Sequence, residues 1–295
     1  MASEPGRDAQ GLGEGPNRAP PRRWGSLVAL CVVGLVVAAP LLYKQAPREM
    51  ARWHQAAALE HYLDGDFAKA RESLTQSLAW RPDNPDAFLL LATWEREGGR
   101  YDEALAACEQ ALAFGASPIR LYLERSQVYQ HLGRWEEGLG DWKLLAEEVE
   151  DGETNPLVLN GRAYARALAN VELDAGMRDI ERALQQAGGN AAMLDTRGYL
   201  HYRLGNLDAA LDDMNKAIEG AEKELAEGAT EATQVDRAAA DARVAERAQK
   251  ERRRSLAVLH YHRLLVLEKQ MATEAADKDR ARIKELGFDA GERLF

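Results

Sequence analysis

The chain has 295 residues and a formal net charge of −10, and 46% of its residues are hydrophobic. Nucleic-acid binding requires a broad surface of Lys and Arg, so an acidic chain of this kind predicts no nucleic-acid partner. One of its two cysteines, Cys31, lies in an apolar run and the other, Cys108, in a predicted helix, which predicts no disulfide between them.

The amino-terminal part reads as a tail followed by a membrane segment. Residues 1–23 are rich in Gly, Pro and Arg and show no apolar periodicity, which is typical of disorder. Residues 24–43 carry no charged side chain, and a helix of that length would span about 30 Å, so they predict a single transmembrane helix that acts as a signal anchor. A cleavable signal peptide is the alternative, because Val37-Ala38-Ala39 resembles a cleavage site, although Pro40 directly after it favours a retained anchor.

The predicted orientation depends on the basic residues that flank this segment. They are equal in number on the two sides, but the Arg22-Arg23 pair lies immediately before the apolar run. We therefore predict a single-pass membrane localisation, with a linker at 44–50 and the rest of the chain on the non-cytoplasmic side.

A repeat begins directly after the linker. Residues 51–84, 85–118 and 119–152 align without a gap, and each window has a glycine followed two places later by an aromatic residue: Gly65/Phe67, Gly99/Tyr101 and Gly133/Trp135. A fixed period of this length predicts a stack of helix pairs, each with its turn at the glycine. In the first repeat the two helices are expected at 52–63 and 67–80.

The later repeats depart from this spacing. Residues 154–190 form a predicted fourth repeat with an insertion in its inner turn at 170–173, and its second helix is expected at 174–186. Residues 191–220 return to register as a fifth repeat. Residues 256–295 predict a degenerate sixth repeat with helices at 256–270 and 276–286, which ends in a polar carboxy-terminal cap.

An Ala/Glu/Arg-rich segment at residues 221–255 separates the fifth and sixth repeats. Its strong helix formers predict that the flanking helices extend into a projecting hairpin, with a bend at Gly228-Ala229-Thr230. The alternative is a solvated and partly frayed linker.

The repeat residues resemble those of the tetratricopeptide repeat (TPR) family. The matching positions are Phe88, Ala92, Gly99, Tyr101, Ala104 and Ala111 in the second repeat, and Tyr122, Ser126, Tyr129, Gly133 and Trp135 in the third. The resemblance implies an all-α fold, a right-handed superhelix of antiparallel helix pairs. It also implies a concave groove, lined by the first helix of each pair, that holds an extended peptide or a partner helix. Gly138, where the family has alanine, and His201, where an aromatic is usual, depart from the pattern.

Candidate binding residues are those whose helical phase points them into this groove: Thr93, Arg96, Gln127, Gln130, Arg162, Arg166, Tyr199, Tyr202 and Arg203. The guanidinium groups among them suit carboxylates on a protein or peptide partner. For any single arginine, a solvated or internally paired side chain is the alternative. The lysine and asparagine clamp by which some chaperone-serving family members hold a terminal carboxylate is absent, because Gln55, Leu59 and Leu89 occupy the comparable positions.

No catalytic, cofactor-binding or metal-binding residues are predicted. His260 and His262 are two positions apart, about 200° around a helix, so they would not share a metal ion. No phosphate-binding loop or nucleophile elbow occurs. The sequence therefore predicts a non-enzymatic, membrane-anchored scaffold that binds a protein or peptide. The alternative is an assembly subunit of a membrane complex that forms oligomers through residues 221–255.

Overall fold

The computed structural model of this chain describes residues 45–149, 151–234 and 239–290. The chain divides into two compact units, Met1–Glu49 and Met50–Phe295. The predicted tail and the predicted transmembrane helix at 24–43 lie outside the described residues. Among the residues that are described, no helix is both long enough and apolar enough to cross a bilayer. This finding overturns the predicted single-pass membrane localisation, which we do not retain.

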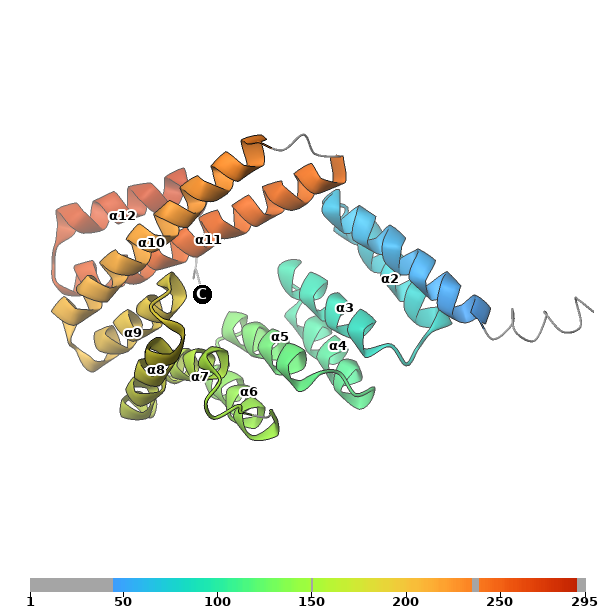
Figure 1. Ribbon diagram of the computed structural model, residues 1–295, viewed down its shortest axis with the longest axis horizontal. Coiled ribbons are helices and arrows are strands. Elements are labelled where there is room, and N and C mark those ends of the chain that lie inside the picture. The colour runs from blue at the N-terminus through green and yellow to red at the C-terminus, as the bar shows by residue number, and fades with distance from the viewer. Residues whose placement is uncertain (1–44, 150, 235–238, 291–295) are drawn as a thin grey trace, which may run out of the picture. The chain divides into compact units, whose positions relative to one another are not determined.

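The second unit is built of antiparallel helix pairs (Figure 1). The first helix runs over residues 45–63, and its part within this unit pairs with α2, since Ser77 donates to the Ala51 carbonyl at 2.8 Å. The helices that follow it are α2 (Phe67–Trp80), α3 (Pro85–Glu97), α4 (Tyr101–Ala113), α5 (Pro118–His131), α6 (Trp135–Glu148), α7 (Pro156–Ala169), α8 (Leu173–Ala187), α9 (Ala191–Leu204), α10 (Leu207–Gln234), α11 (Ala239–Lys269) and α12 (Thr273–Glu285). Each odd-numbered helix from α3 to α11 packs against the next helix in the chain.

Local signals in the sequence set the helix ends. Asn84 caps α3 by accepting a hydrogen bond from the Ala87 amide, and the following proline fits the first turn of a helix, where no donor is needed. The turn between the first two helices contains Gly65 at φ +78°, a conformation that only glycine adopts without strain. The predicted bounds of α2, 67–80, are therefore confirmed.

The inner turn of the fourth pair has an unusual backbone. Asn170 and Glu172 both adopt the left-handed conformation, at φ +56° and +48°. Asn170 tolerates this region better than most residues. The Glu172 carboxylate accepts hydrogen bonds from Lys143 at 2.8 Å and from Arg166 at 3.0 Å, which hold the turn from two sides. The predicted insertion at 170–173 thus lies in this turn, and α8 begins one residue before the predicted start.

The core consists of apolar side chains buried between successive pairs. Ala104, Ala107 and Ala111 let α4 approach its neighbours, and larger side chains such as Leu121 and Trp142 fill the remaining space. The ring of Trp142 lies directly over Gly161 of α7, where an added Cβ would come within 2.2 Å of it. Position 161 therefore accepts only glycine at this helix–helix contact.

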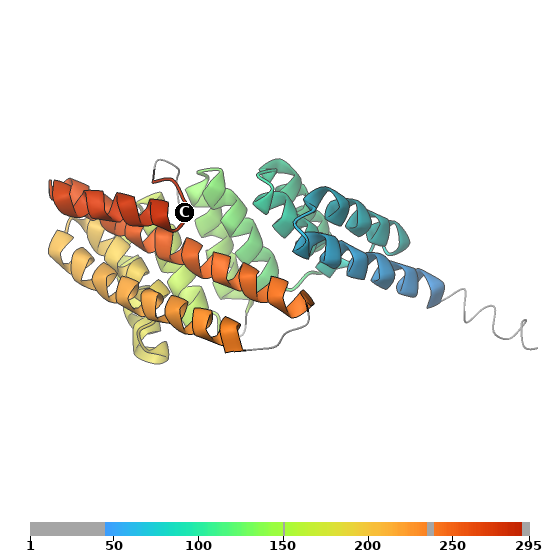
Figure 2. The same ribbon diagram turned by 90° about the horizontal axis from the view of Figure 1, so that it is seen from above.

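Helices α10 and α11 are about twice as long as most of the others and run back alongside the earlier pairs toward the helix at 45–63 (Figure 2). The bend predicted at residues 228–230 is wrong, because α10 continues through them to Gln234. One glycine among strong helix formers costs only about 1 kcal/mol, too little to end the helix. The second half of α11 enters the core through Leu256, Ala257 and Leu259, so one helix both runs alongside the earlier pairs and belongs to the last pair.

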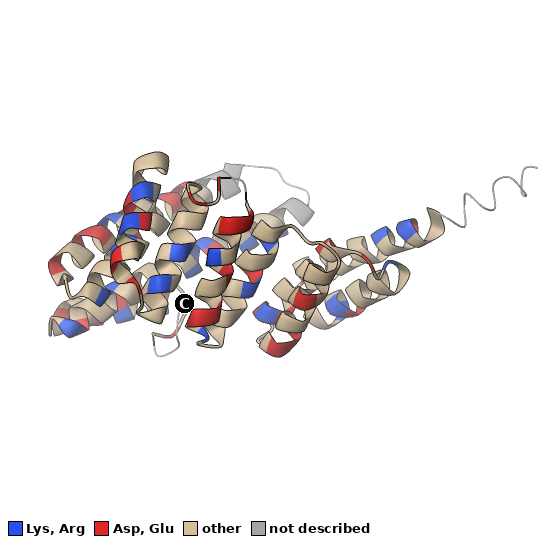
Figure 3. Ribbon diagram, turned by 90° about the horizontal axis from the view of Figure 1, so that it is seen from below, with Lys and Arg blue, Asp and Glu red and all other residues tan. Residues whose placement is uncertain are grey.

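An ion pair between an arginine and a buried aspartate joins the two helices in four of the described pairs. The arginine lies on the first helix and the aspartate 16 or 17 positions later on the second: Arg125–Asp141, Arg162–Asp179, Arg197–Asp213 and Arg263–Asp279. The 17-residue spacing belongs to the pair with the longer inner turn. Figure 3 shows basic and acidic residues interspersed over the helices.

Candidate functional site

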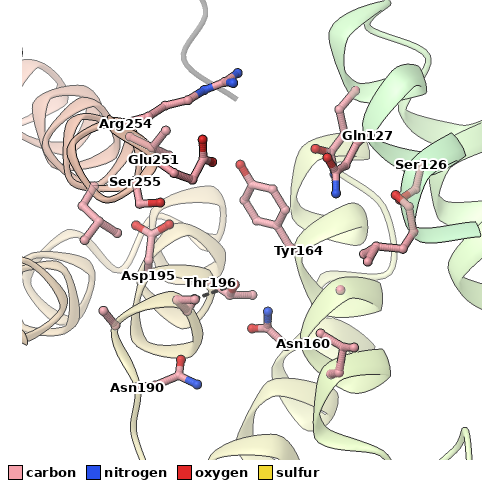
Figure 4. A pocket seen from close by; sticks show the side chains of 18 of the residues that line it. Ser126, Gln127, Asn160, Tyr164, Asn190, Asp195, Thr196, Glu251, Arg254 and Ser255 are labelled. Atoms are coloured by element: carbon pink, nitrogen blue, oxygen red, sulfur yellow. Dashed lines mark hydrogen bonds between the residues drawn. The ribbon is translucent and has the colours of Figure 1, made fainter. Parts of the chain in front are cut away.

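A cavity of about 790 Å³ lies within the second unit. One side is formed by α3, α5, α7 and α9, the first helices of four successive pairs, and the other by α10 and α11. The volume is in the range of ligand-binding pockets. Figure 4 shows side chains from these elements converging on the same space.

The lining residues recur at a fixed helical phase. On both α5 and α7 they fall at positions i, i+3, i+4 and i+7, which is one face of a helix. The lining residues at this phase are Leu123, Ser126, Gln127 and Gln130 on α5 and Leu157, Asn160, Gly161 and Tyr164 on α7. Helix α9 adds Ala192, Asp195 and Thr196 at the same spacing.

Side-chain amides are prominent on the α5–α7 side. Gln127 and Gln130 line the cavity from α5, and Asn160 lines it from α7. The Asn160 Oδ1 atom is buried and has no hydrogen-bond partner in the part of the chain that the structure describes. A buried carbonyl oxygen without a partner is costly, so this side of the cavity is suited to a ligand that supplies an N–H donor.

The α11 side carries charged and hydroxyl groups. Ser255 lies next to Asp195, and Glu251 faces Tyr164 across the cavity, which Arg254 also lines (Figure 4). Burial, with contributions from Arg96 and Arg254, lowers the pKa of His131 to about 4. This cavity residue is therefore neutral at pH 7, although it lies among charged neighbours.

Two lining residues, Tyr164 and Asp195, belong to a buried hydrogen-bonded group from three helices, which we call the floor of the cavity. His262 Nδ1 of α11 lies 2.8 Å from Asp195 Oδ2 of α9, and its Nε2 lies 3.5 Å from the Tyr164 hydroxyl of α7. Burial, followed by the charge of Asp195, raises the pKa of Tyr164 well above its usual value. This group fixes α11 against the repeat helices and gives the cavity a rigid base.

The structure brings three of the predicted site residues into the cavity: Arg96, Gln127 and Gln130. The Arg96 guanidinium is already paired, since its Nε donates to Glu124 at 2.6 Å. Thr93 donates to the same carboxylate at 3.0 Å. The amides of α5 are therefore the more available of these groups.

Arg162 and Arg166 do not have the placement that was expected from helical phase. Both are buried, with exposed fractions of 7% and 8%, and both donate to Asp179 of α8. Glu153 also accepts from Arg162, and hydrogen bonds to both acids, working against burial, raise the pKa of that guanidinium. The expected groove arginines thus lie inside the α7–α8 pair, because an acidic partner on the second helix draws them away from the concave face.

The remaining predicted residues lie beside the cavity. Tyr199 is buried and stacks on His262 with ring centroids 4.8 Å apart. Tyr202 stacks on Tyr199 in turn, and Arg203 donates to Asn170 at 3.2 Å. The three residues consequently pack around the floor and the fourth inner turn.

Sequence reasoning missed every residue that lines the cavity from α7, α9 and α11. Extending the helical phase of Gln127 and Gln130 to the next repeats could have identified the lining residues Asn160, Tyr164, Asp195 and Thr196. The fourth repeat departs from the regular spacing, however, so the phase was assigned to the wrong residues there. No repeat signal pointed to Glu251, Arg254 or Ser255 of α11, because these residues precede the predicted sixth repeat at 256–295.

The two neighbouring histidines have different acidic partners. His260 pairs with Asp279 at 2.7 Å, and His262 pairs with Asp195. Across residues 45–149, 151–234 and 239–290, no group of three or more His, Cys, Asp or Glu side chains is arranged to hold a metal ion. Burial raises the pKa of the Cys108 thiol to about 12, so it is not an activated nucleophile.

Comparison with protein families identifies the repeats. Tetratricopeptide repeat models match residues 61–113 and 191–223. The chain therefore contains TPR repeats, as its residue pattern predicted. No curated protein matches the chain.

Solved structures agree on the fold. A tetratricopeptide repeat protein from Parabacteroides merdae is 20% identical with a TM-score of 0.52, over 81% of this chain and 94% of that one. PilW, a widely conserved type IV pilus biogenesis factor, is 14% identical with a TM-score of 0.54, over 80% and 92%. The Cut9–Hcn1 assembly of the APC/C gives 17% identity and a TM-score of 0.51, over 83% and 45%. Similarity at this level shows the all-α TPR fold alone.

Proposed function

We propose, from the TPR repeats that this chain contains, that it is a non-catalytic scaffold whose cavity binds an extended peptide segment of a protein partner. The cavity side chains support this proposal, because Gln127, Gln130 and Asn160 offer amides along one side. Each amide carries both donors and an acceptor, as does the peptide backbone. The unpartnered Asn160 oxygen is the single observation that carries the proposal furthest.

The fold supports a protein partner over a small molecule. The lining residues come from four successive repeat helices, so the site is elongated along the stack. Cut9, which shares this fold, is found in a hetero-tetramer with Hcn1. An extended segment can contact several repeats at once and gain a small contribution from each.

Peptide selection followed by titration tests this function. Peptides selected from a random library on the full chain are measured by fluorescence anisotropy against Asn160→Ala and Gln127→Ala. We expect each substitution to weaken binding about tenfold, as for loss of one or two hydrogen bonds to a buried partner. Gln110→Ala, on the exposed side of α4, is the matched control. Equal affinity for all four proteins would place the binding surface elsewhere.

The alternative, an assembly subunit that forms oligomers through residues 221–255, makes a separate prediction. Deletion of 221–255 would lower the mass in light scattering if these helices joined subunits. Against it, Arg243 and Arg247 of this segment already contact Asp64 and Glu97 of the same chain. We therefore favour the peptide-binding scaffold.

A further inference from the structure

The first turns of α11 reach back to the beginning of the repeat stack. Arg247 donates to Glu97 Oε2 at 2.6 Å and to the Tyr62 hydroxyl, although 150 and 185 positions separate these residues from it. Arg243 contacts the Asp64 carboxylate. We call residues 242–250 of α11 the arm.

Arg247 occupies a site that is built for a cation. Its guanidinium carbon lies 4.0 Å from the centroid of the Tyr62 ring, within cation–π distance. Two other aromatic side chains fix the position of the Tyr62 ring. It stacks on Trp94 with ring centroids 4.7 Å apart and meets Phe67 edge-on at 5.6 Å. The Tyr62 hydroxyl donates to Glu97 at 2.7 Å, which fixes the carboxylate next to the ring. An aromatic face beside a positioned carboxylate is a standard arrangement for binding arginine.

The arm itself is weakly held. None of residues 242–250 is buried, so the arm contributes nothing to the apolar core. Ion pairs near the surface are individually weak and are screened by salt. The contacts of Arg243 and Arg247 can therefore be exchanged for equivalent contacts from another molecule.

The cation site and the cavity share one residue. Glu97 accepts from Arg247 and also lines the cavity at its α3 end. On these grounds we infer that Tyr62 and Glu97 form an arginine-binding subsite at the end of the cavity, and that Arg247 is its internal occupant in the free protein. A bound peptide places a basic side chain there and displaces the arm. This inference names the ligand chemistry at one end of the proposed peptide site and thus rests on the proposed function, but the subsite can be tested without a peptide.

Arginine amide is the probe for the vacant subsite. Removal of the internal occupant by Arg247→Ala is expected to create a saturable site for arginine amide, with a Kd on the order of millimolar, read from Trp94 fluorescence. The wild-type protein should bind the probe at least tenfold more weakly, because Arg247 competes for the same contacts. Arg253→Ala, an exposed arginine on the same helix, is the control and should behave as the wild type. Glutamine amide, which has no charge, should not bind.

Adding Glu97→Gln to Arg247→Ala separates the subsite from a nonspecific effect. The double variant should lose at least tenfold in affinity for arginine amide and keep its helical circular dichroism. Equal binding by wild type and Arg247→Ala, absence of binding by Arg247→Ala, or full retention by the double variant would overturn the inference.

Spin labels test displacement of the arm directly. Glu60→Cys and Lys250→Cys place labels at two exposed positions, with Cys31→Ser in the background and Cys108 buried. We expect a single narrow distance in the wild type and added longer distances in Arg243→Ala/Arg247→Ala. The variant Asp64→Arg/Arg243→Asp exchanges the two charges and so keeps an ion pair at this contact. It should show the same narrow distance as the wild type. Unchanged distances in the double alanine variant would show that Arg243 and Arg247 do not hold the arm in place, and would refute this part of the inference. Displacement without any measurable peptide binding would instead refute the proposed function and leave the arginine subsite standing.

Discussion

The second and third helix pairs, α3–α4 and α5–α6, fill the same interior positions in opposite ways. The third pair has Arg125 and Asp141, joined at 2.9 Å. The residues 34 positions earlier are Leu91 and Ala107, which pack in the apolar cluster. One repeat position thus accepts either an ion pair or two apolar side chains, so the fold depends on filling the space and not on how it is filled.

Breaking the ion pair should have the largest effect. Asp141→Ala leaves the Arg125 guanidinium without its acid in a site where Asp141 is 2% exposed. We expect a loss of about 3–5 kcal/mol in the free energy of unfolding, measured by urea denaturation. A loss below about 1 kcal/mol would mean that water or Tyr122 replaces the acid.

Acid should destabilise the third pair through His131, where the second pair has Glu97. The pKa of His131 is about 4 in the folded chain and about 6.5 when unfolded, so the unfolded state binds the proton more readily. Stability from this residue is complete above pH about 6.5 and falls as the pH drops toward 4, by at most about 3 kcal/mol. Between pH 7.5 and 4 the wild type should lose stability that His131→Gln retains, which urea unfolding of both proteins measures as a pH-dependent difference in their free energies of unfolding. Parallel curves would contradict this assignment.

Replacing Gly138 should raise the free energy of unfolding by a smaller amount. The second pair has Ala104 at this position, and a Cβ at 138 would meet its neighbours at 3.5 and 3.6 Å, which is ordinary contact. Gly138→Ala should therefore stabilise the chain by about 0.5–1 kcal/mol through helix propensity. Gly161→Ala, whose Cβ would overlap Trp142, is the contrasting variant and should lower the melting temperature.

Converting the third pair to the second should give the smallest net change. Arg125→Leu/Asp141→Ala copies the residues of α3 and α4 and removes both charges together. The double variant should lie within about 1 kcal/mol of the wild type or above it, although Asp141→Ala alone is severely destabilising. Simple addition of the two single losses would show that the interior positions are not equivalent.

Much of the fold could be predicted because the turn and cap residues act locally. The glycine–aromatic spacing predicted the helix pairs, and α2 begins and ends as expected. The binding residues were harder to predict, because the direction of a side chain depends on its partners. Arg162 and Arg166 have the right phase for the groove, yet Asp179 holds them in the interior. The spacing of 16 or 17 residues between arginine and aspartate was the signal that could have shown this.

Long-range contacts lay beyond sequence reasoning. The contact between Arg247 and Tyr62 joins the Ala/Glu/Arg-rich segment at 221–255 to the first repeat, and no periodicity relates two segments that differ in composition. The same holds for Glu251 and Arg254, which reach the cavity only because α11 folds back along the stack.

Helix α11 runs for 31 residues and bears the arm at one end and the buried His262 near the other. The helix is anchored in the core from Leu256 onward, whereas the residues before it lie outside the core. Movement of the arm must therefore either bend α11 near Ser255 or shift His262 relative to Asp195 at the floor of the cavity. If α11 stays straight, a change at the contacts of Arg243 and Arg247 with the first repeats is transmitted to the contact between His262 and Asp195.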